Sequence, residues 1–363
     1  MNIIFGISVF VILMYFIYPL WLMIFPAIDK DKEEGSGEIG QVSLILLTYN
    51  GIAYLDEKIN FLIKELSVFN QFELVIIDDN STDGTRELLN NYADRENIRI
   101  ILKDEHKGIP NTMNLGVKQA RYEYIIFCDQ RQNLSGNILH RLVEPLKYHN
   151  TGAVSACISE FDKGQCCSRM RRYENFIKSK ESQGGNLMGV YGPLYAIKKE
   201  CYTVIPDYII LDDLYLSLKI LKSKQIKIIE ECKIIDEEIV VLYDYNRAKR
   251  YIMGFLQLIK ENELISVLNT RQMTMLFWHK YLRLTIPIFL FLSYISLGVL
   301  AAIEMQYLFV FSIITILVVL SVIPGRLKIL SGFKNLIRIN LFYFVAIIDV
   351  IVYRSFIRKI ALR

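Results

Sequence analysis

Aspartates stand at a few places in the chain where their carboxylates could do chemistry. Asp79 and Asp129 each follow a short apolar run, and the adjacent pair Asp212 and Asp213 precedes an amphipathic stretch. Such carboxylates can bind a divalent cation through hard oxygen ligands, or one of them can act as a general base. Helix capping, or an acidic first helical turn, is the structural alternative for any one of these segments taken alone.

Basic residues near these aspartates could hold the phosphates of a nucleotide. Lys107 precedes a glycine, and Arg131 stands two residues after Asp129. Arg247 and Arg250 fall on one face of an expected helix. Lysine and arginine bind phosphate oxygens through charge-assisted hydrogen bonds, and arginine often forms two at once. A solvated surface lysine and a basic helix at a membrane surface are the alternatives.

Short apolar runs alternate with helix-compatible segments in the region that holds these residues. The runs expected to be buried strands are residues 42–47, 74–77, 98–102 and 124–128. Helical spacing occurs between them at residues 52–69, 84–93 and 110–120. This order predicts a doubly wound α/β fold with a Rossmann-like, mostly parallel sheet. Ligands of such sheets bind at the carboxyl ends of the strands, where Thr48, Tyr49 and Asn50 also stand.

Several common functions are excluded by features that the sequence lacks. No GxGxxG follows the first apolar run and no GxxxxGK[ST] occurs, which removes the commonest dinucleotide and nucleoside triphosphate sites. The formal net charge is only +4, and the basic residues form no stripe interleaved with aromatic ones, so nucleic acid is not an expected partner. The six cysteines include no CxxC pair, which indicates reduced thiols rather than a zinc site.

Long runs without charge at both ends of the chain predict membrane-spanning helices. The first lies within residues 1–28, and it is too long for the apolar core of a signal peptide, which is the alternative. Two further runs, 284–303 and 305–325, are separated by a single glutamate. The last run, 339–353, is short and contains Asp349, so it could span the bilayer, dip into it or lie at its surface.

These patterns predict five parts of the chain. They are an N-terminal transmembrane helix (1–28), a linker (29–40), a globular domain (41–260), an interfacial helix region (261–283) and two or three C-terminal transmembrane helices (284–363). A plain helix at the edge of the domain is the alternative for the interfacial region. The loop after residue 325 is basic, which predicts an integral protein of the plasma membrane with this loop and the globular domain in the cytoplasm.

Seven motifs resemble, in order, those of the family 2 inverting glycosyltransferases, whose catalytic domain has the GT-A fold. They are VSLILLTYNG, LVIIDDNSTDGT, Lys107-Gly108 followed by Asn111 and Asn114, IIFCDQRQNL, LMGVYGPLYAIKKECY, ILDDLYLSLKIL and NRAKRYIMGFLQ. The resemblance covers about residues 42–257, and the motifs together are far more specific than any one of them. It implies a GT-A domain that binds a nucleotide-sugar and transfers the sugar with inversion at the anomeric carbon.

The resemblance also implies roles for individual residues. One set of residues would bind the nucleotide-sugar: Thr48, Tyr49, Asn50, Asp79, Lys107, Arg247 and Arg250. Of these, the aspartate would contact the uracil or ribose, and the lysine and the arginines would lie near the diphosphate. Asp213 would be the base that deprotonates the acceptor hydroxyl, and Asp212 would orient it. Gly189, Gly192 and Tyr251 would shape the pocket for the acceptor and the sugar.

The sequence departs from the family in its metal-binding motif. Asp129 matches the first aspartate of Asp-x-Asp, which in the family holds a divalent cation, Mg²⁺ or Mn²⁺, on the diphosphate. Arg131 occupies the place of the second aspartate, so the segment resembles a subset of the family with Asp-x-Arg-Gln. Either Asp129 holds the metal with help from elsewhere, or Arg131 supplies positive charge to the phosphates directly.

Four functions stay open at this level. The first is transfer of a hexosyl or N-acetylhexosaminyl group, from a UDP-sugar, to a lipid-linked or polysaccharide acceptor at the membrane. The second is processive synthesis of a polysaccharide that is extruded between the helices; the family's Gln-x-x-Arg-Trp motif, altered here to Arg-x-x-Arg-Tyr, argues weakly against it. The third is transfer of another nucleotide-activated group by the same fold. The fourth is a catalytically silent adaptor that binds nucleotide at the membrane.

Overall fold

The computed structural model describes residues 1–27, 37, 39–162, 165–166, 169–236, 245–322 and 331–352. Most of the predicted linker, the basic loop after residue 325 and the C-terminal tail lie outside these residues. The chain forms two compact units. The smaller comprises Met1–Phe25, Val240–Leu256 and Met273–Ile357, and the larger is made mainly of Pro26–Ile239 and Gln257–Gln272. This division differs from the predicted boundary at residue 260, because most of one amphipathic helix belongs to the smaller unit.

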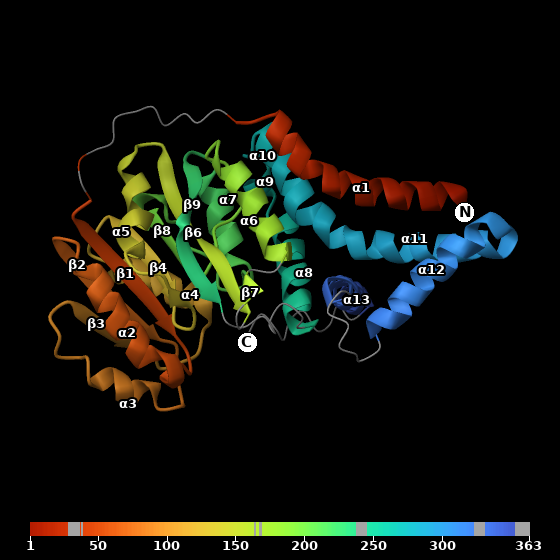
Figure 1. The fold of residues 1–363 in the computed structure, drawn as a ribbon. Coiled ribbons are helices and arrows are strands. Elements are labelled where there is room, and N and C mark those ends of the chain that lie inside the picture. Colours follow the sequence, from red (N-terminus) through yellow and green to blue (C-terminus); the bar gives the residue numbers. More distant parts are fainter. Residues whose placement is uncertain are drawn as a thin grey trace. The chain divides into compact units, whose positions relative to one another are not determined.

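The larger unit is built on one sheet with the strand order β3-β2-β1-β4-β8-β6-β9-β5, and β7 pairs with β6 (Figure 1). Its strands are β1 (Gln41–Thr48), β2 (Gln71–Asp78), β3 (Ile98–Leu102), β4 (Tyr124–Asp129), β5 (Asn133–Leu134), β6 (Thr151–Asp162), β7 (Gln165–Cys166), β8 (Leu194–Lys198) and β9 (Gln225–Asp236). The helices of this unit are α2 (Ile52–Leu66), α3 (Thr85–Asn90), α4 (Ile109–Gln119), α5 (Ile138–Val143), α6 (Arg169–Ser182), α7 (Asp212–Ile220) and α9 (Asn262–Ile265).

The predicted β-α-β-α-β-α-β order is confirmed in the first half of this unit. β3, β2, β1 and β4 pair in parallel. The central apolar side chains of β2, β1 and β4 are buried because both faces of a parallel sheet are covered, whereas those of the edge strand β3 are half-buried. The register places Thr48 opposite Asp78 and Leu47 opposite Asp129. The strand ends therefore meet at one edge of the sheet, as the sequence predicted.

Beyond β4 the sheet is mixed, which corrects the prediction of a mostly parallel sheet. β8 runs antiparallel to both of its neighbours, β4 and β6, and β6 pairs in parallel with β9. β8 is inserted between strands that are distant from it in sequence, and no local pattern specifies such a pairing. Its antiparallel course matters for the site because the segment that enters β8 lies beside the carboxyl end of β4.

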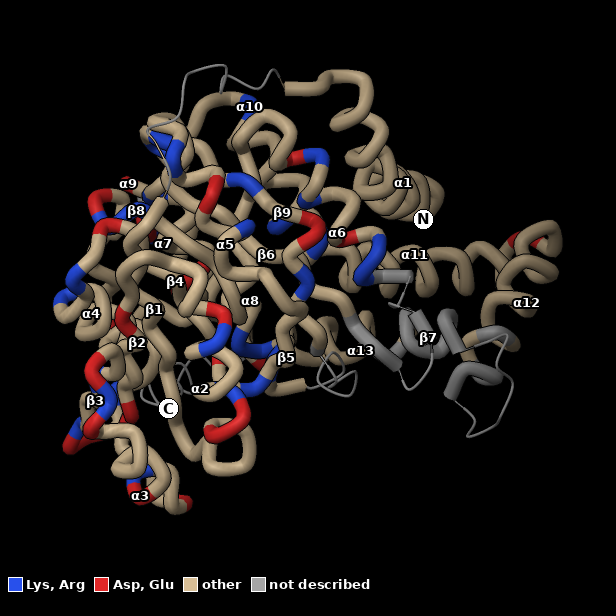
Figure 2. The backbone as a smooth tube through the Cα atoms, turned by 60° about the vertical axis from the view of Figure 1, so that its left-hand side comes forward, with Lys and Arg blue, Asp and Glu red and all other residues tan. Residues whose placement is uncertain are grey.

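The smaller unit consists of α1 (Asn2–Ile24), most of α8 (Tyr245–Lys260), α11 (Arg283–Ile303), α12 (Met305–Val322) and α13 (Ser331–Val352), with the π-helical segment η4 (Leu276–Leu282) leading into α11. Among the residues that the structure describes, two helices are long and apolar enough to cross a membrane, Asn2–Ile24 and the continuous helix Thr270–Ile303. Figure 2 shows α1 without a charged residue. Its exposed side chains are largely apolar, as a helix in lipid requires.

The helix Thr270–Ile303 includes α10 (Thr270–Met275) and continues through the predicted boundary at residue 283. It does so because neither glycine nor proline interrupts residues 270–286. Within the smaller unit, Lys249 of α8 forms an ion pair with Asp349 of α13, and the Tyr245 hydroxyl donates to the same carboxylate. The apolar run that carries Asp349 therefore holds a paired charge, as a charge in an apolar setting requires.

Candidate functional site

The turn after β1 is locked to the segments that follow β2 and β4. The amide of Asn50, whose φ is 48°, donates to the Ser81 hydroxyl at 2.8 Å, and the Asn50 side-chain oxygen accepts from the amide of Thr82 at 2.9 Å. A Cβ on Gly51 would lie 2.0 Å from Oε1 of Gln130, so a larger residue here would displace the Gln130 side chain. The predicted nucleotide-binding residue Asn50 thus has a structural role in shaping this turn.

Tyr49 and His106 present a pair of rings beside this turn. The Tyr49 side chain is 44% exposed, and its ring centroid lies 4.2 Å from that of His106 with an interplanar angle of 30°. His106 is fixed in turn by Asp79, since its Nδ1 lies 2.9 Å from Oδ2 of that carboxylate. Stacked rings with an exposed face can receive a nucleobase. Sequence reasoning found Tyr49 but missed His106, although it immediately precedes the Lys107-Gly108 motif.

Asp79 is almost fully buried and binds the segment that follows β3. Its carboxylate accepts from the amides of Gly108 at 2.8 Å and Lys107 at 3.1 Å, and it forms an ion pair with Lys103. Gly108 has a φ of 83°, which favours glycine at this bend. In this structure Asp79 positions the Lys107–Gly108 turn, and its contact with a uracil or ribose stays a prediction. The Lys107 ammonium is half-exposed and lies 3.2 Å from Glu105.

Asp129 ends β4 beside the turn that leads into β8. Its amide donates to the carbonyl of Pro193 at 2.9 Å, which ties the two segments together. The neighbouring Gln130 accepts from the Thr48 hydroxyl and donates from Nε2 to the carbonyl of Tyr49 at 3.1 Å. Sequence reasoning missed this role of Gln130. The Arg131 side chain is exposed, and the described residues contain no group of three side chains arranged to hold a metal ion.

Asp212 and Asp213 begin α7. Oδ1 of Asp213 accepts from the amide of Leu214 at 2.7 Å, so the structural alternative of an acidic helix start is part of its role. Oδ2 of Asp213 lies 3.6 Å from the position that a Cβ on Gly192 would occupy. The backbone of Gly192 therefore lies beside this carboxylate, and a Cβ there would make ordinary van der Waals contact with it. The place of Gly192 in a pocket wall stays a prediction.

The segment before Gly192 is held by side chains of α6. The Gly189 carbonyl, in a residue with φ of 110°, accepts from Nζ of Lys178 at 2.5 Å. Nζ of Lys178 also lies 3.8 Å from the ring centroid of Tyr191, whose hydroxyl donates to Asn175 at 2.8 Å. Lys178 is buried, and sequence reasoning did not identify it because a lysine in a polar helix carries no signal of burial.

The negative charges of three predicted aspartates act on the hydroxyl of Tyr195. Burial raises the pKa of the Tyr195 hydroxyl, and the negative charges of Asp212, Asp213 and Asp129 raise it further. These carboxylates come from the end of β4 and the start of α7, so the fold brings them together. Thr48, Tyr49 and Asp79 lie along the same edge of the sheet, joined to Asp129 through Gln130 and the turn after β1.

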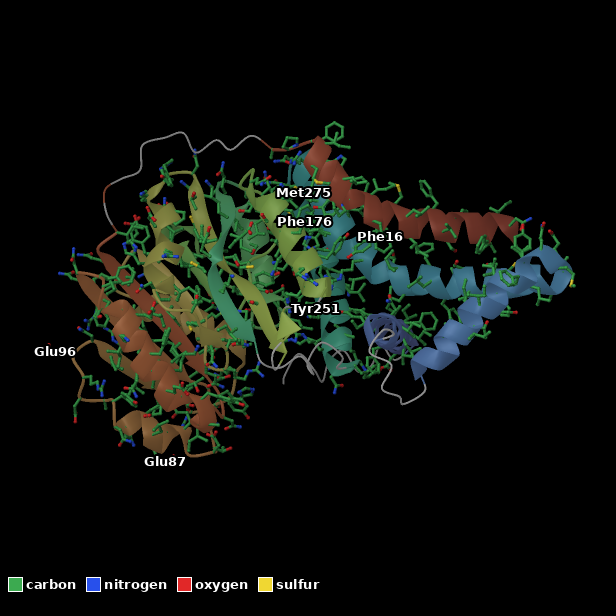
Figure 3. The ribbon with its side chains drawn as sticks, viewed as in Figure 1. Phe16, Glu87, Glu96, Phe176, Tyr251 and Met275 are labelled. Atoms are coloured by element: carbon green, nitrogen blue, oxygen red, sulfur yellow. The ribbon has the colours of Figure 1, made fainter. Side chains whose placement is uncertain are left out.

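Arg247, Arg250 and Tyr251 are the predicted site residues that lie in the smaller unit, on α8 (Figure 3 labels Tyr251). The Arg247 guanidinium stands over the Tyr251 ring, 5.9 Å from its centroid. The expected helix and the shared face of these residues are therefore present. Their part in binding a diphosphate or an acceptor stays a prediction.

Comparison with known proteins shows that part of the larger unit is similar to glycosyltransferase domains. Residues 43–202 match the family model "Glycosyl transferase family 2". The chain is 34% identical over 88 residues to the poly(ribitol-phosphate) beta-N-acetylglucosaminyltransferase TarS of Staphylococcus aureus, covering 24% of this chain and 15% of that protein. It is 25% identical over 214 residues to the poly-beta-1,6-N-acetyl-D-glucosamine synthase of the same species, covering 56% of this chain and half of the synthase.

Among solved structures, the chain resembles the mannosyltransferase PcManGT from Pyrobaculum calidifontis, which was determined with GDP-Man and Mn²⁺. The TM-score is 0.72 and the identity 17%, and the alignment covers 95% of this chain and 98% of the other. At this identity the likeness shows the fold. The GT-A fold expected from the seven motifs is supported by this comparison and by the family model.

Proposed function

We propose that this protein is a membrane-anchored glycosyltransferase that moves a sugar from a nucleotide-sugar, a UDP-sugar by preference, to a lipid-linked or glycan acceptor with inversion. The observation that carries the proposal is that Asp129 and Asp213 flank one segment at the carboxyl edge of the sheet: the Asp129 amide donates to Pro193, and Oδ2 of Asp213 lies beside Gly192. The comparisons support a nucleotide-sugar glycosyltransferase, and two relatives are named for N-acetylglucosamine. An N-acetylhexosaminyl donor is therefore the first to test.

The donor would bind along the ends of β1, β2 and β4. The exposed rings of Tyr49 and His106 offer a face for the base, and the amide-rich turn held by Asp79 lies next to them. Lys107, beside this turn, would supply positive charge for a phosphate. The sugar would then extend toward Asp129 and Gly192, where the carboxylates gather.

In this proposal Asp213 is the general base. Its Oδ1 is held by the amide of Leu214, and Oδ2 makes no hydrogen bond to a described residue, so Oδ2 can accept the proton of an acceptor hydroxyl. As that proton moves to Oδ2, the acceptor oxygen bonds to the anomeric carbon and the bond from that carbon to the diphosphate oxygen breaks. A single displacement of this kind inverts the configuration. Asp212 would orient the base from the preceding position.

A divalent cation, Mg²⁺ or Mn²⁺, fits this site with Asp129 as a protein ligand. Such ions are often held by one or two carboxylates together with substrate phosphates and water, so the lack of three clustered ligands among the described residues is compatible with one. When bound, the ion would neutralise the leaving diphosphate. PcManGT, which has the same fold, was solved with Mn²⁺. Arg131 would add positive charge at the exposed side of the phosphates.

We place the enzyme in the plasma membrane, with the larger unit in the cytoplasm. The two long apolar helices support the membrane location, and the cytoplasm is where nucleotide-sugars are available. Processive synthesis is the second candidate, because the 214-residue match is to a protein named as a polymer synthase. Product length separates the candidates: a transferase adds a defined number of sugars to its acceptor, and a synthase yields a ladder of long chains.

The test uses the purified full-length protein with UDP-, GDP- and TDP-sugars, with and without Mn²⁺, and follows release of the nucleoside diphosphate. Asp213→Asn keeps the size of the side chain and its bond to the Leu214 amide but removes the base. We expect turnover by the wild type and a loss of at least about a hundredfold in this variant. If the two proteins bind nucleotide alike and neither turns over, the protein is a nucleotide-binding adaptor and the proposal fails.

A further inference from the structure

The hydroxyl of Tyr195 is a buried polar group whose partner is absent from the empty protein. Tyr195 is only 2% exposed, and its hydroxyl oxygen makes no hydrogen bond to any described residue. Burying a hydroxyl without a partner destabilises a folded protein, and nearly all buried polar side chains are satisfied. A phenylalanine would fill the same space without this cost. The hydroxyl at this position therefore calls for a partner in another state of the protein.

The ring of Tyr195 is fixed, so the hydroxyl cannot swing toward a distant partner. β8 pairs with β4 on one side and β6 on the other, which places Tyr195 opposite both Phe127 and Ser155. The Tyr195 and Phe127 rings are stacked, with centroids 4.9 Å apart and an interplanar angle of 27°. A partner for the hydroxyl must therefore come to it.

The hydroxyl faces the carboxylates at the end of the sheet. Side chains two residues apart on a strand share a face, so Asp129 lies on the same side of β4 as Phe127, and Tyr195 stands opposite Phe127. The segment that enters β8 carries Gly192 against the Asp213 carboxylate and Pro193 bonded to the Asp129 amide. Both aspartates thus flank the start of the strand that holds Tyr195.

The carboxylates near Tyr195 are suited to an uncharged hydrogen-bond donor such as its hydroxyl. After burial, the strongest influence that raises the pKa of Tyr195 is the Asp212 carboxylate, and Asp213 and Asp129 follow. Burial and the Asp212 charge also raise the pKa of Tyr202. Ionised carboxylates only accept hydrogen bonds. A phenol can hold one of them without adding a cation that would compete for the others.

We propose that Tyr195 is a positioning residue: when the donor binds, the Asp212 carboxylate accepts a hydrogen bond from the Tyr195 hydroxyl and thereby orients Asp213 for proton abstraction. This inference rests on the proposed glycosyl transfer. Asp212 is the acceptor because Oδ1 of Asp213 already accepts from Leu214 and its Oδ2 is needed for the acceptor proton. The bond would also hold the Asp212 carboxylate in place. Its negative charge would then not move toward Asp213 and disturb the alignment of the base.

The experiment compares Tyr195→Phe with a matched variant, Tyr202→Phe, in the full-length protein. The ring centroids of Tyr202 and Phe127 lie 6.2 Å apart. The Tyr202 hydroxyl donates to Oδ1 of Asn114 at 2.7 Å, so this hydroxyl has a partner without substrate. Three quantities are measured: kcat for the donor that the wild type turns over fastest, the Kd of the corresponding nucleoside diphosphate, and the midpoint of thermal unfolding. Tyr195→Phe is also combined with Asp212→Ala.

We expect Tyr195→Phe to lower kcat roughly 10- to 100-fold, because a hydrogen bond to a charged group is lost, and to leave Kd within about twofold. Its unfolding midpoint should equal or exceed that of the wild type, since no bond is lost in the empty protein. Tyr202→Phe should instead lower the midpoint by roughly 2–4 °C and keep kcat within about twofold. In the Asp212→Ala background, which has no acceptor for the Tyr195 hydroxyl, Tyr195→Phe should have little further effect on kcat.

The other outcomes overturn the inference in different ways. Unchanged kcat in Tyr195→Phe removes the positioning role, and a weaker Kd would make Tyr195 a direct contact of the donor instead. A midpoint that falls as in Tyr202→Phe would show an ordinary structural bond. Equal loss of kcat with and without Asp212→Ala would show that Tyr195 does not act through Asp212. Absence of turnover by the wild type with any donor would refute the proposed function, and this inference would fall with it.

Discussion

Replacing Asp79 by asparagine tests whether this carboxylate holds the turn after β3. The substitution keeps the shape of the side chain but removes the charge that faces Lys103, and both side chains of this ion pair are at least nine-tenths buried. Removing one partner of a buried ion pair costs about 3–5 kcal/mol because the other charge stays buried. Lys103 keeps a hydrogen bond to the Thr112 hydroxyl at 3.0 Å, so we expect about 3 kcal/mol, the lower end of that range.

The charge-neutral double variant separates the ion pair from the hydrogen bonds. Asparagine can accept one of the two backbone bonds from Lys107 and Gly108, so losing the other costs about 1 kcal/mol. Asp79→Asn combined with Lys103→Met removes both charges. Its cost should therefore be only about 1–2 kcal/mol, well below the sum of the two single changes. Asp207→Asn, at an exposed position, is the control and should stay within about 0.5 kcal/mol.

The assay must report on the larger unit, and the two tryptophans do not, since Trp21 and Trp278 both belong to the smaller one. Cys128 is buried in β4, so its alkylation rate relative to that in the unfolded protein gives the free energy of opening of the larger unit. Opening free energies within about 1 kcal/mol of wild type for Asp79→Asn would refute the ion-pair argument. A double variant as unstable as the sum of the singles would refute it too.

Two further predictions concern the nucleotide and the buried thiol. Tyr49→Ala should weaken the binding of UDP about tenfold, roughly 1.4 kcal/mol, in isothermal titration, because half of the ring pair with His106 is lost. The control is Tyr54→Ala, since Tyr54 is 46% exposed and Tyr49 is 44% exposed; this variant should bind UDP as the wild type does. Burial raises the pKa of Cys128 to about 11, so the native thiol should resist iodoacetamide at pH 8. Fast labelling of native protein at pH 8, detected by peptide mass spectrometry, would contradict its burial.

The first half of the larger unit could be predicted because its strands are continuous apolar runs. β1 and β4 match the predicted residues 42–47 and 124–128 closely. β2 begins at Gln71, three residues before the predicted run, because the buried Glu73 accepts from the Ser43 hydroxyl at 2.6 Å and from the amide of Arg121. A polar residue satisfied by distant partners cannot be recognised from local hydrophobicity.

The second half was harder to predict because its pairings are non-local and its longest strands mix charged with apolar residues. β9 contains lysines and glutamates throughout, and it pairs with β6 through an irregular register. β8 reads as a short apolar run, but nothing near it in sequence reveals that it lies between β4 and β6. The position of Tyr195 next to the aspartates follows from that insertion, so the residue had no signal as part of the site.

The aspartates of the strand ends divide into two kinds that the sequence could not distinguish. In the sequence, Asp78 and Asp79 cannot be distinguished from Asp129 and Asp213, because each stands at the end of a strand or the start of a helix. The oxygens of Asp79 are engaged by a lysine and two amides, so it cannot accept a proton or a metal without releasing the turn that it holds. Asp213 keeps Oδ2 against a glycine that leaves room beside it. We therefore propose that the chemistry lies with the aspartates near Tyr195, and that the aspartates after β2 shape the surface that would receive the nucleotide.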